Sequence, residues 1–156
     1  MNVIAPTRPT ERHVCRVRLS AGPIAVPEAR SQVGAVISAW DVPVDRGVAI
    51  LLTSELVTNA VRHEAGGTVT LSVTCSCGRL RVDVHDTSLL LPVLMEAPAD
   101  AEAGRGLMLV AALSDQWGVY PTPAGKAVYF TLGFRSDLAG SRVRGPQGFA
   151  RGDCES

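Results

Sequence analysis

The sequence predicts a two-layer α/β (α+β) domain in which helices cover one face of a mixed, mainly antiparallel sheet. Segments of strand and helix periodicity alternate along the chain in the order β-α-α-β-β-loop-α-β-β. With 156 residues the chain has the size of one domain, and 46% hydrophobic residues suffice for a single core. Strand pairs that follow each other closely form hairpins, and the helices between them pack on the sheet.

The first strand is expected at His13–Leu19, where polar and apolar side chains alternate. Apolar residues then recur at helical spacing over Ile24–Trp40, which predicts a first helix. A second helix is predicted from about Asp45, a good N-cap, to about Glu64, and Gly66-Gly67 stops it.

Four strands with period-two alternation and β-branched residues are expected to form two hairpins: Thr68–Thr74 with Leu80–Asp86, and Gln116–Tyr120 with Ala127–Leu132. Residues 88–103 lack such a pattern and are interpreted as a long loop. A turn at Gly104-Arg105-Gly106 is expected to open a third helix, Leu107–Leu113.

The domain is expected to span residues 12–134, between a flexible arm at 1–11 and a disordered tail at 135–156 that is rich in Gly, Arg, Ser and Pro. The formal charge of zero argues against nucleic acid or an acidic membrane surface as a partner. No apolar run reaches the roughly 20 residues of a membrane helix, and Met1–Thr10 has no signal-peptide core, so a cytoplasmic protein is expected.

The second helix combines an apolar N-terminal half with a polar stripe. Glu55, Asn59, Arg62 and His63 fall within roughly 100° of one another around the helix. A buried carboxylate or amide needs a partner, and a magnesium–phosphate group would satisfy all four side chains. The alternative is a stripe that faces solvent, with Glu55 paired to Arg62 or Asn59.

Two further signals follow in the chain. Asp86 continues the apolar side of its strand, so its carboxylate could accept a hydrogen bond from an amine in an apolar pocket, or cap the turn with Thr87 and Ser88. Gly104-Arg105-Gly106 lies directly before a helix, where backbone N–H groups can approach phosphates, although a flexible hinge would look the same.

Taken in order, these segments closely resemble the GHKL ATPase superfamily: E-L-V-T-N-A-V-R-H (55–63), D-T-S (86–88), G-R-G-L-M-L-V (104–110), W-G-V (117–119) and G-K-A-V-Y-F (125–130). The resemblance covers roughly residues 12–134 and is greatest to the anti-sigma-factor serine kinases of actinobacteria. It implies the Bergerat ATP-binding fold, that is, a histidine-kinase-like ATPase domain, with ATP and Mg²⁺ as cofactors.

The resemblance also implies a role for each matching residue. Glu55 is similar to the general base and Asn59 to the magnesium ligand. Asp86 is similar to the aspartate that reads adenine. The remaining ATP-binding positions are Arg62, His63, Gly104, Arg105, Gly106 and Leu107. One departure is clear, because the family's D-x-G-x-G motif reads Asp86-Thr87-Ser88-Leu89-Leu90 here, without either glycine.

Two functions are compatible with these residues. The first is a protein-serine/threonine kinase that phosphorylates an anti-anti-sigma antagonist, which the Glu55 and Asn59 motif favours. The second is a non-catalytic ATP-binding module that regulates by binding a sigma factor or antagonist, which the missing glycines favour. The resemblance also allows a homodimer.

Overall fold

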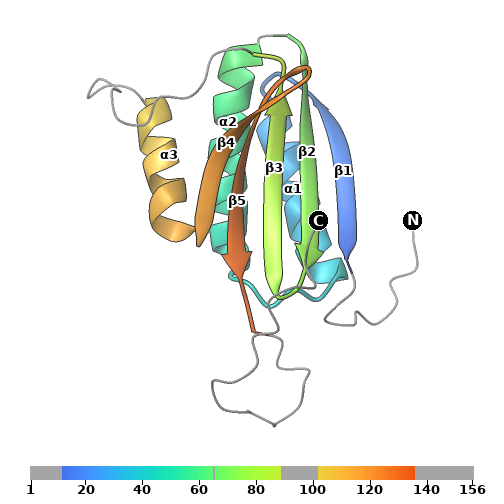
Figure 1. Cartoon of the computed structure of the whole chain (residues 1–156). Helices are drawn as coiled ribbons and strands as arrows, with labels where there is room; N and C mark the ends of the chain where they lie inside the picture. Colours follow the sequence, from blue (N-terminus) through green and yellow to red (C-terminus); the bar gives the residue numbers. More distant parts are fainter. Residues whose placement is uncertain (1–11, 65, 89–101, 136–156) are drawn as a thin grey trace.

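The computed structural model describes residues 12–64, 66–88 and 102–135. Within them lie five strands and three helices in the predicted order (Figure 1): β1 His13–Ser20, α1 Ala25–Ala39, α2 Arg46–Glu64, β2 Thr68–Ser76, β3 Arg79–Asp86, α3 Glu102–Leu113, β4 Gln116–Thr122 and β5 Gly125–Gly133. The expected arm at 1–11, residues 89–101 of the expected loop and residues 136–156 of the expected tail lie outside the described residues.

The strands form one sheet in the order β1-β2-β3-β5-β4, and all four pairings are antiparallel. The expected α+β fold with a mainly antiparallel sheet is confirmed. Because β5 inserts between β3 and β4, residues near the end of β3 pair with residues at the start of β5. Asp86 is thereby the register partner of Lys126.

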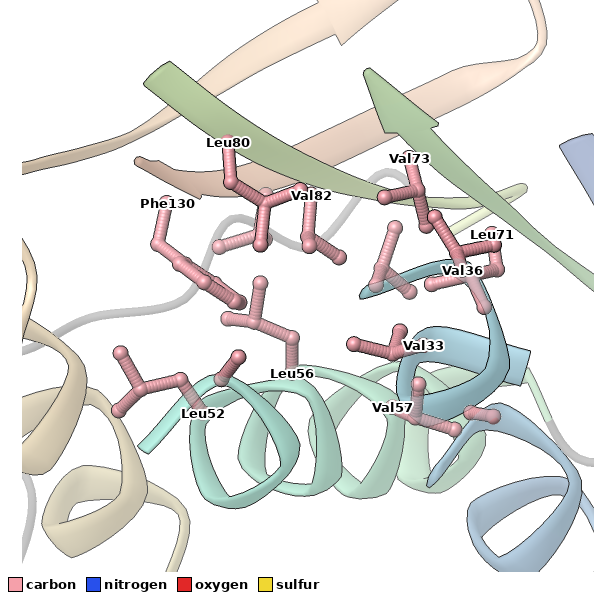
Figure 2. Packing of buried hydrophobic residues seen from close by; sticks show 14 of the residues in the cluster. Val33, Val36, Leu52, Leu56, Val57, Leu71, Val73, Leu80, Val82 and Phe130 are labelled. Carbon is pink, nitrogen blue, oxygen red and sulfur yellow. The ribbon is translucent and has the colours of Figure 1, made fainter. Parts of the chain in front are cut away.

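The three helices lie on the same side of the sheet, with α2 in contact with both α1 and α3 (Figure 1). Leu52 and Leu56 of α2 point toward the sheet, where they meet Phe130 and the β2 and β3 side chains (Figure 2). Asp45 caps α2 as predicted, since its Oδ1 accepts a hydrogen bond of 3.0 Å from the Val48 N–H. None of the described helices is long and apolar enough to cross a membrane.

The second hairpin is tighter than the sequence predicts. The loop was expected to span Pro121–Lys126, but β4 continues to Thr122 and β5 begins at Gly125. Pro121 is tolerated because β4 is an edge strand, where one missing N–H need not break a ladder. The turn is closed by a hydrogen bond of 3.0 Å from the Gly125 N–H to Thr122 Oγ1. Lys126 therefore lies in a strand, not in a loop.

The start of α3 also differs from the prediction. The helix begins at Glu102, so Gly104-Arg105-Gly106 lies within it and does not form a turn before it. Glycine weakens a helix by about 1 kcal/mol per residue, yet packing can offset that cost. At Gly106 the packing is visible, because a Cβ there would lie 2.5 Å from Glu55 Oε2 of α2. The glycine lets the two helices approach each other at Glu55.

Candidate functional site

The polar residues of α2 lie along one line of the helix, because Glu55, Asn59 and His63 are spaced by four residues. Glu55 is half-buried beside Gly106 of α3. Asn59 is buried, and His63 is half-buried next to the ends of β3 and β5. Arg62 is exposed on the neighbouring turn. The line therefore runs from α3 to the sheet.

Asn59 is the outstanding residue on this line. Its side chain is 4% exposed, and neither Nδ2 nor Oδ1 has a hydrogen-bond partner among the described residues. An unsatisfied buried amide costs about 1–3 kcal/mol, so native proteins rarely keep one without a reason. This burial contradicts the alternative of a fully solvated stripe for Asn59. An amide oxygen without a partner also fits a magnesium ion in character, since Mg²⁺ prefers oxygen ligands.

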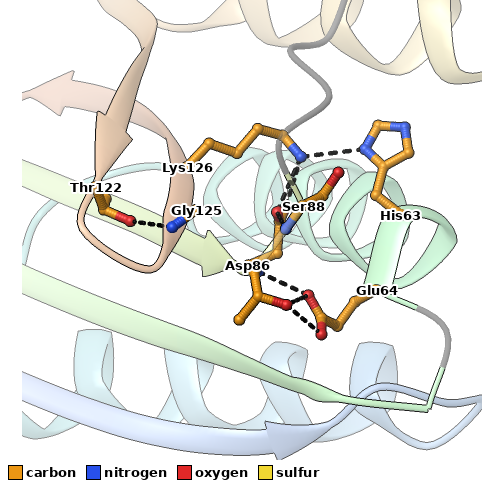
Figure 3. A network of polar contacts seen from close by, with 8 residues as sticks. His63, Glu64, Asp86, Ser88, Thr122, Gly125 and Lys126 are labelled. Atoms are coloured by element: carbon orange, nitrogen blue, oxygen red, sulfur yellow. Dashed lines mark hydrogen bonds and ion pairs between the residues drawn. The ribbon is translucent and has the colours of Figure 1, made fainter.

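Asp86 lies at the end of β3 and is paired with Lys126 of β5 (Figure 3). The Lys126 ammonium lies 2.8 Å from Asp86 Oδ2 and 3.0 Å from Oδ1. Both side chains are only 1% exposed. Gly125 makes this approach possible, because a Cβ there would collide with the backbone of Asp86 and Thr87. The carboxylate is thus buried with a matching charge.

His63 completes a three-residue cluster, since its Nδ1 lies 3.2 Å from Lys126 Nζ (Figure 3). An ammonium group can only donate, so Nδ1 accepts and the ring proton of neutral His63 resides on Nε2. Burial lowers the pKa of His63 below its usual 6.5, and the positive charge of Lys126 lowers it further. The histidine is therefore neutral near pH 7.

The turn after Asp86 is held by hydrogen bonds. Asp86 Oδ1 accepts a bond of 2.8 Å from the Ser88 N–H, which confirms the turn-capping role considered for it. Glu64, the last residue of α2, accepts bonds of 2.7 Å from the Thr87 N–H and 2.6 Å from Thr87 Oγ1 (Figure 3). These contacts fix the turn in the segment where the family motif has glycines.

The remaining predicted site residues belong to α3. Leu107 is 3% exposed and packs in the core, so only its backbone could contribute to a ligand site. Gly104 and Arg105 lie in the first turn of the helix. The motif analysis gives Lys126 no role, although it is the only lysine in the chain and follows a glycine. Its partner across the sheet could not be identified from the sequence alone.

Comparison with known proteins identifies the family. A model of the histidine kinase-like ATPase domain matches residues 19–132. The chain belongs to this family. The resemblance inferred from the motifs is therefore confirmed, and membership implies nucleotide binding.

Two individual proteins are similar to the chain. An uncharacterized protein of Streptomyces coelicolor is 41% identical over an alignment of 71 positions, and the match covers 42% of this chain and 67% of that protein. The crystal structure of the RsbU and RsbW domains of Rv1364c from Mycobacterium tuberculosis has a similar fold, with a TM-score of 0.57 and 17% identity. That match covers 80% of this chain and 35% of the other, so this chain spans about a third of the length of that protein.

Proposed function

We propose that the chain is an ATP- and Mg²⁺-binding regulatory protein that acts as a protein-serine/threonine kinase on an anti-anti-sigma antagonist. The observation that carries the proposal is Asn59, a buried amide that has no hydrogen-bond partner among residues 12–64, 66–88 and 102–135. It lies between Glu55 and the Asp86 cluster in a histidine kinase-like ATPase domain. A ligand that reaches from Asp86 past Asn59 to Glu55 would need a nucleobase at the Asp86 end and phosphates at the Glu55 end.

Each residue has a role in this proposal. Asp86 accepts a hydrogen bond from the adenine amine, and Asn59 holds the magnesium ion that neutralises the phosphates. Arg62 supplies positive charge from the exposed side of α2. The first turn of α3, with Gly104 and Arg105, offers backbone N–H groups and the positive end of the helix dipole to the phosphates, and Gly106 directly follows this turn.

Glu55 is the proposed base. It is half-buried at the end of the line that lies against α3, so one side of its carboxylate can meet an incoming hydroxyl. The hydroxyl oxygen of a serine or threonine attacks the γ-phosphorus, the bond to the β-phosphate oxygen breaks, ADP leaves and Glu55 takes the hydroxyl proton. Phosphoryl transfer asks a protein mainly for such positioning and for charge neutralisation.

The test is transfer of label from γ-labelled ATP, with Mg²⁺, to a panel of candidate antagonist proteins. We expect label on a serine or threonine of one antagonist. The matched control is Glu55→Gln, which keeps the size of the side chain but cannot accept the proton, and which should bind the antagonist without labelling it.

A non-catalytic binding module is the second candidate. It is favoured by the turn after Asp86, which is held by Glu64 and lacks the family's glycines. In that case the wild-type protein would bind a sigma factor or an antagonist in the presence of ATP and would transfer no label to it. A wild-type protein that forms such a complex, without phosphate transfer to any member of the panel, would decide for the module.

A further inference from the structure

We propose that Lys126 determines which purine the site accepts, by leaving Asp86 one free hydrogen-bond acceptor and no donor. The inference rests on the proposed nucleotide site and assigns a residue to its base specificity. Lys126 is a positioning residue here, since it acts on the base through Asp86.

The hydrogen-bond capacities around Lys126 are nearly used up. An ammonium group has three donors, and Lys126 directs them to Asp86 Oδ1, Asp86 Oδ2 and His63 Nδ1. The Asp86 carboxylate has about four acceptor positions, of which two face Lys126 and one faces the Ser88 N–H. One acceptor position on Oδ2 remains for a ligand.

That remaining position distinguishes the two common classes of purine. Adenine carries an amino group at C6, which can donate to Asp86. Hypoxanthine and guanine carry a carbonyl oxygen at C6, which needs a donor. Lys126 has none left, and an ionised carboxylate has none. A 6-oxo purine would therefore place two acceptors against each other in a buried site, which is unfavourable.

The positive charge of Lys126 is necessary for this selectivity. Asp86 is 4% exposed, and Lys126 Nζ holds both of its carboxylate oxygens, at 3.0 and 2.8 Å. Without the ammonium partner the carboxylate would lose these two hydrogen bonds and the orientation that they fix. The free acceptor position would then no longer be held toward the amino group of the base, so the preference for adenine would be lost.

The experiment measures the dissociation constants of ATP and inosine 5′-triphosphate by calorimetry in the presence of Mg²⁺. The two nucleotides differ only at the C6 position of the base and its N1 proton. A hydrogen bond to a charged group predicts that wild-type protein binds ATP roughly 10–100-fold more tightly. In Lys126→Met the ratio of the inosine triphosphate dissociation constant to that of ATP should fall to within about threefold of unity, because the hydrogen bond that distinguishes the two bases is lost. Lys126→Gln keeps a donor without the charge, and its ratio should fall in the same direction.

A matched control separates selectivity from loss of stability. Leu80→Ala removes buried volume at the other end of β3 and lowers stability without touching the cluster, so its ratio should equal that of the wild type. If Lys126→Met does not fold, Lys126→Gln carries the test. A wild-type ratio in either folded Lys126 variant overturns the inference and leaves the proposed function standing. Equal binding of the two nucleotides by the wild type also overturns it, whereas no binding of either overturns the proposed function itself.

Discussion

The two ends of the polar line on α2 differ in how well their groups are satisfied. At the sheet end, His63, Asp86 and Lys126 satisfy one another, and both charges are buried as a pair. In the middle and toward α3, Asn59 is buried without a hydrogen-bond partner in the described part of the chain, beside a half-buried Glu55. The sheet end is thus organised in advance, whereas we propose that the α3 end is completed by a ligand.

This difference indicates which residues of the line contribute to stability and which are available for function. Substitution of a residue in the paired cluster should cost stability, because it leaves a buried charge uncompensated. Substitution of Asn59 should have the opposite sign, because it removes an unsatisfied group. The two ends can therefore be distinguished by experiment even before a partner protein is known.

The largest expected effect is on phosphate transfer. Glu55→Ala should bind ATP and the antagonist normally and transfer phosphate about 10²–10⁴-fold more slowly, because a positioned base contributes that much. Single-turnover transfer of γ-labelled phosphate measures it. Gly106→Ala is an informative companion, since its added methyl group would displace the Glu55 carboxylate. A Glu55→Ala protein that transfers phosphate at the wild-type rate would refute the assignment of the base.

Loss of one member of the buried pair should give the largest effect on stability. Asp86→Ala leaves the Lys126 ammonium buried without its counter-ion, and we expect a loss of about 3–5 kcal/mol in the free energy of unfolding. Urea denaturation measures it. The double variant Asp86→Leu with Lys126→Met should recover most of the loss, because apolar residues of similar volume replace buried pairs at little cost. Normal stability in Asp86→Ala would show that the pair does not form.

Asn59→Leu should stabilise the protein in the absence of nucleotide. The substitution removes an amide that has no partner among the residues that the structure describes, and it fills a similar volume. We therefore expect a gain of about 1–3 kcal/mol in the free energy of unfolding. The same urea experiment without ATP or Mg²⁺ measures it. A loss of stability would mean that the Asn59 amide has partners in the folded protein before any ligand binds.

The smallest effect should be a dependence of stability on pH. Burial, reinforced by Lys126, lowers the pKa of His63, so the unfolded chain binds a proton before the folded one does. Stability is then complete above pH 6.5 and declines as the pH falls below 6.5. Burial also lowers the pKa of His85, with Arg16 adding to the effect. His63→Gln should reduce the slope of melting temperature against pH, His85→Gln should do likewise, and an unchanged slope in both would contradict the pKa directions.

Most of the fold could be predicted from the sequence, because periodicity decides the existence and order of its elements. Two boundaries could not be predicted. Helix α3 begins five residues earlier than expected although it contains two glycines, one of which, Gly106, lies where a Cβ would meet Glu55 of α2. The start of β5 depends on its pairing with β3, which only the tertiary structure reveals.

The sequence names candidate residues for the site, whose roles stay predictions, but not the pairing between them. The motifs identify Asn59 and Asp86, and the structure buries both. Their roles toward ATP and Mg²⁺ remain predictions. The partner of Asp86 was not predicted, since Lys126 follows it by forty positions and no local pattern joins them. A sheet register that places β5 beside β3 brings them together.

The central claim is that Asn59 is left unsatisfied for a magnesium–nucleotide ligand, and melting with and without that ligand tests it most directly. Wild-type protein and Asn59→Leu are each melted alone, with ATP and EDTA, and with ATP and Mg²⁺. At a free nucleotide concentration of 100 times Kd, wild-type protein should gain about 2.7 kcal/mol of stability with Mg²⁺ and much less with EDTA. Asn59→Leu should gain little in either case. An equal Mg²⁺-dependent gain in Asn59→Leu, or no gain in the wild type, would contradict the account.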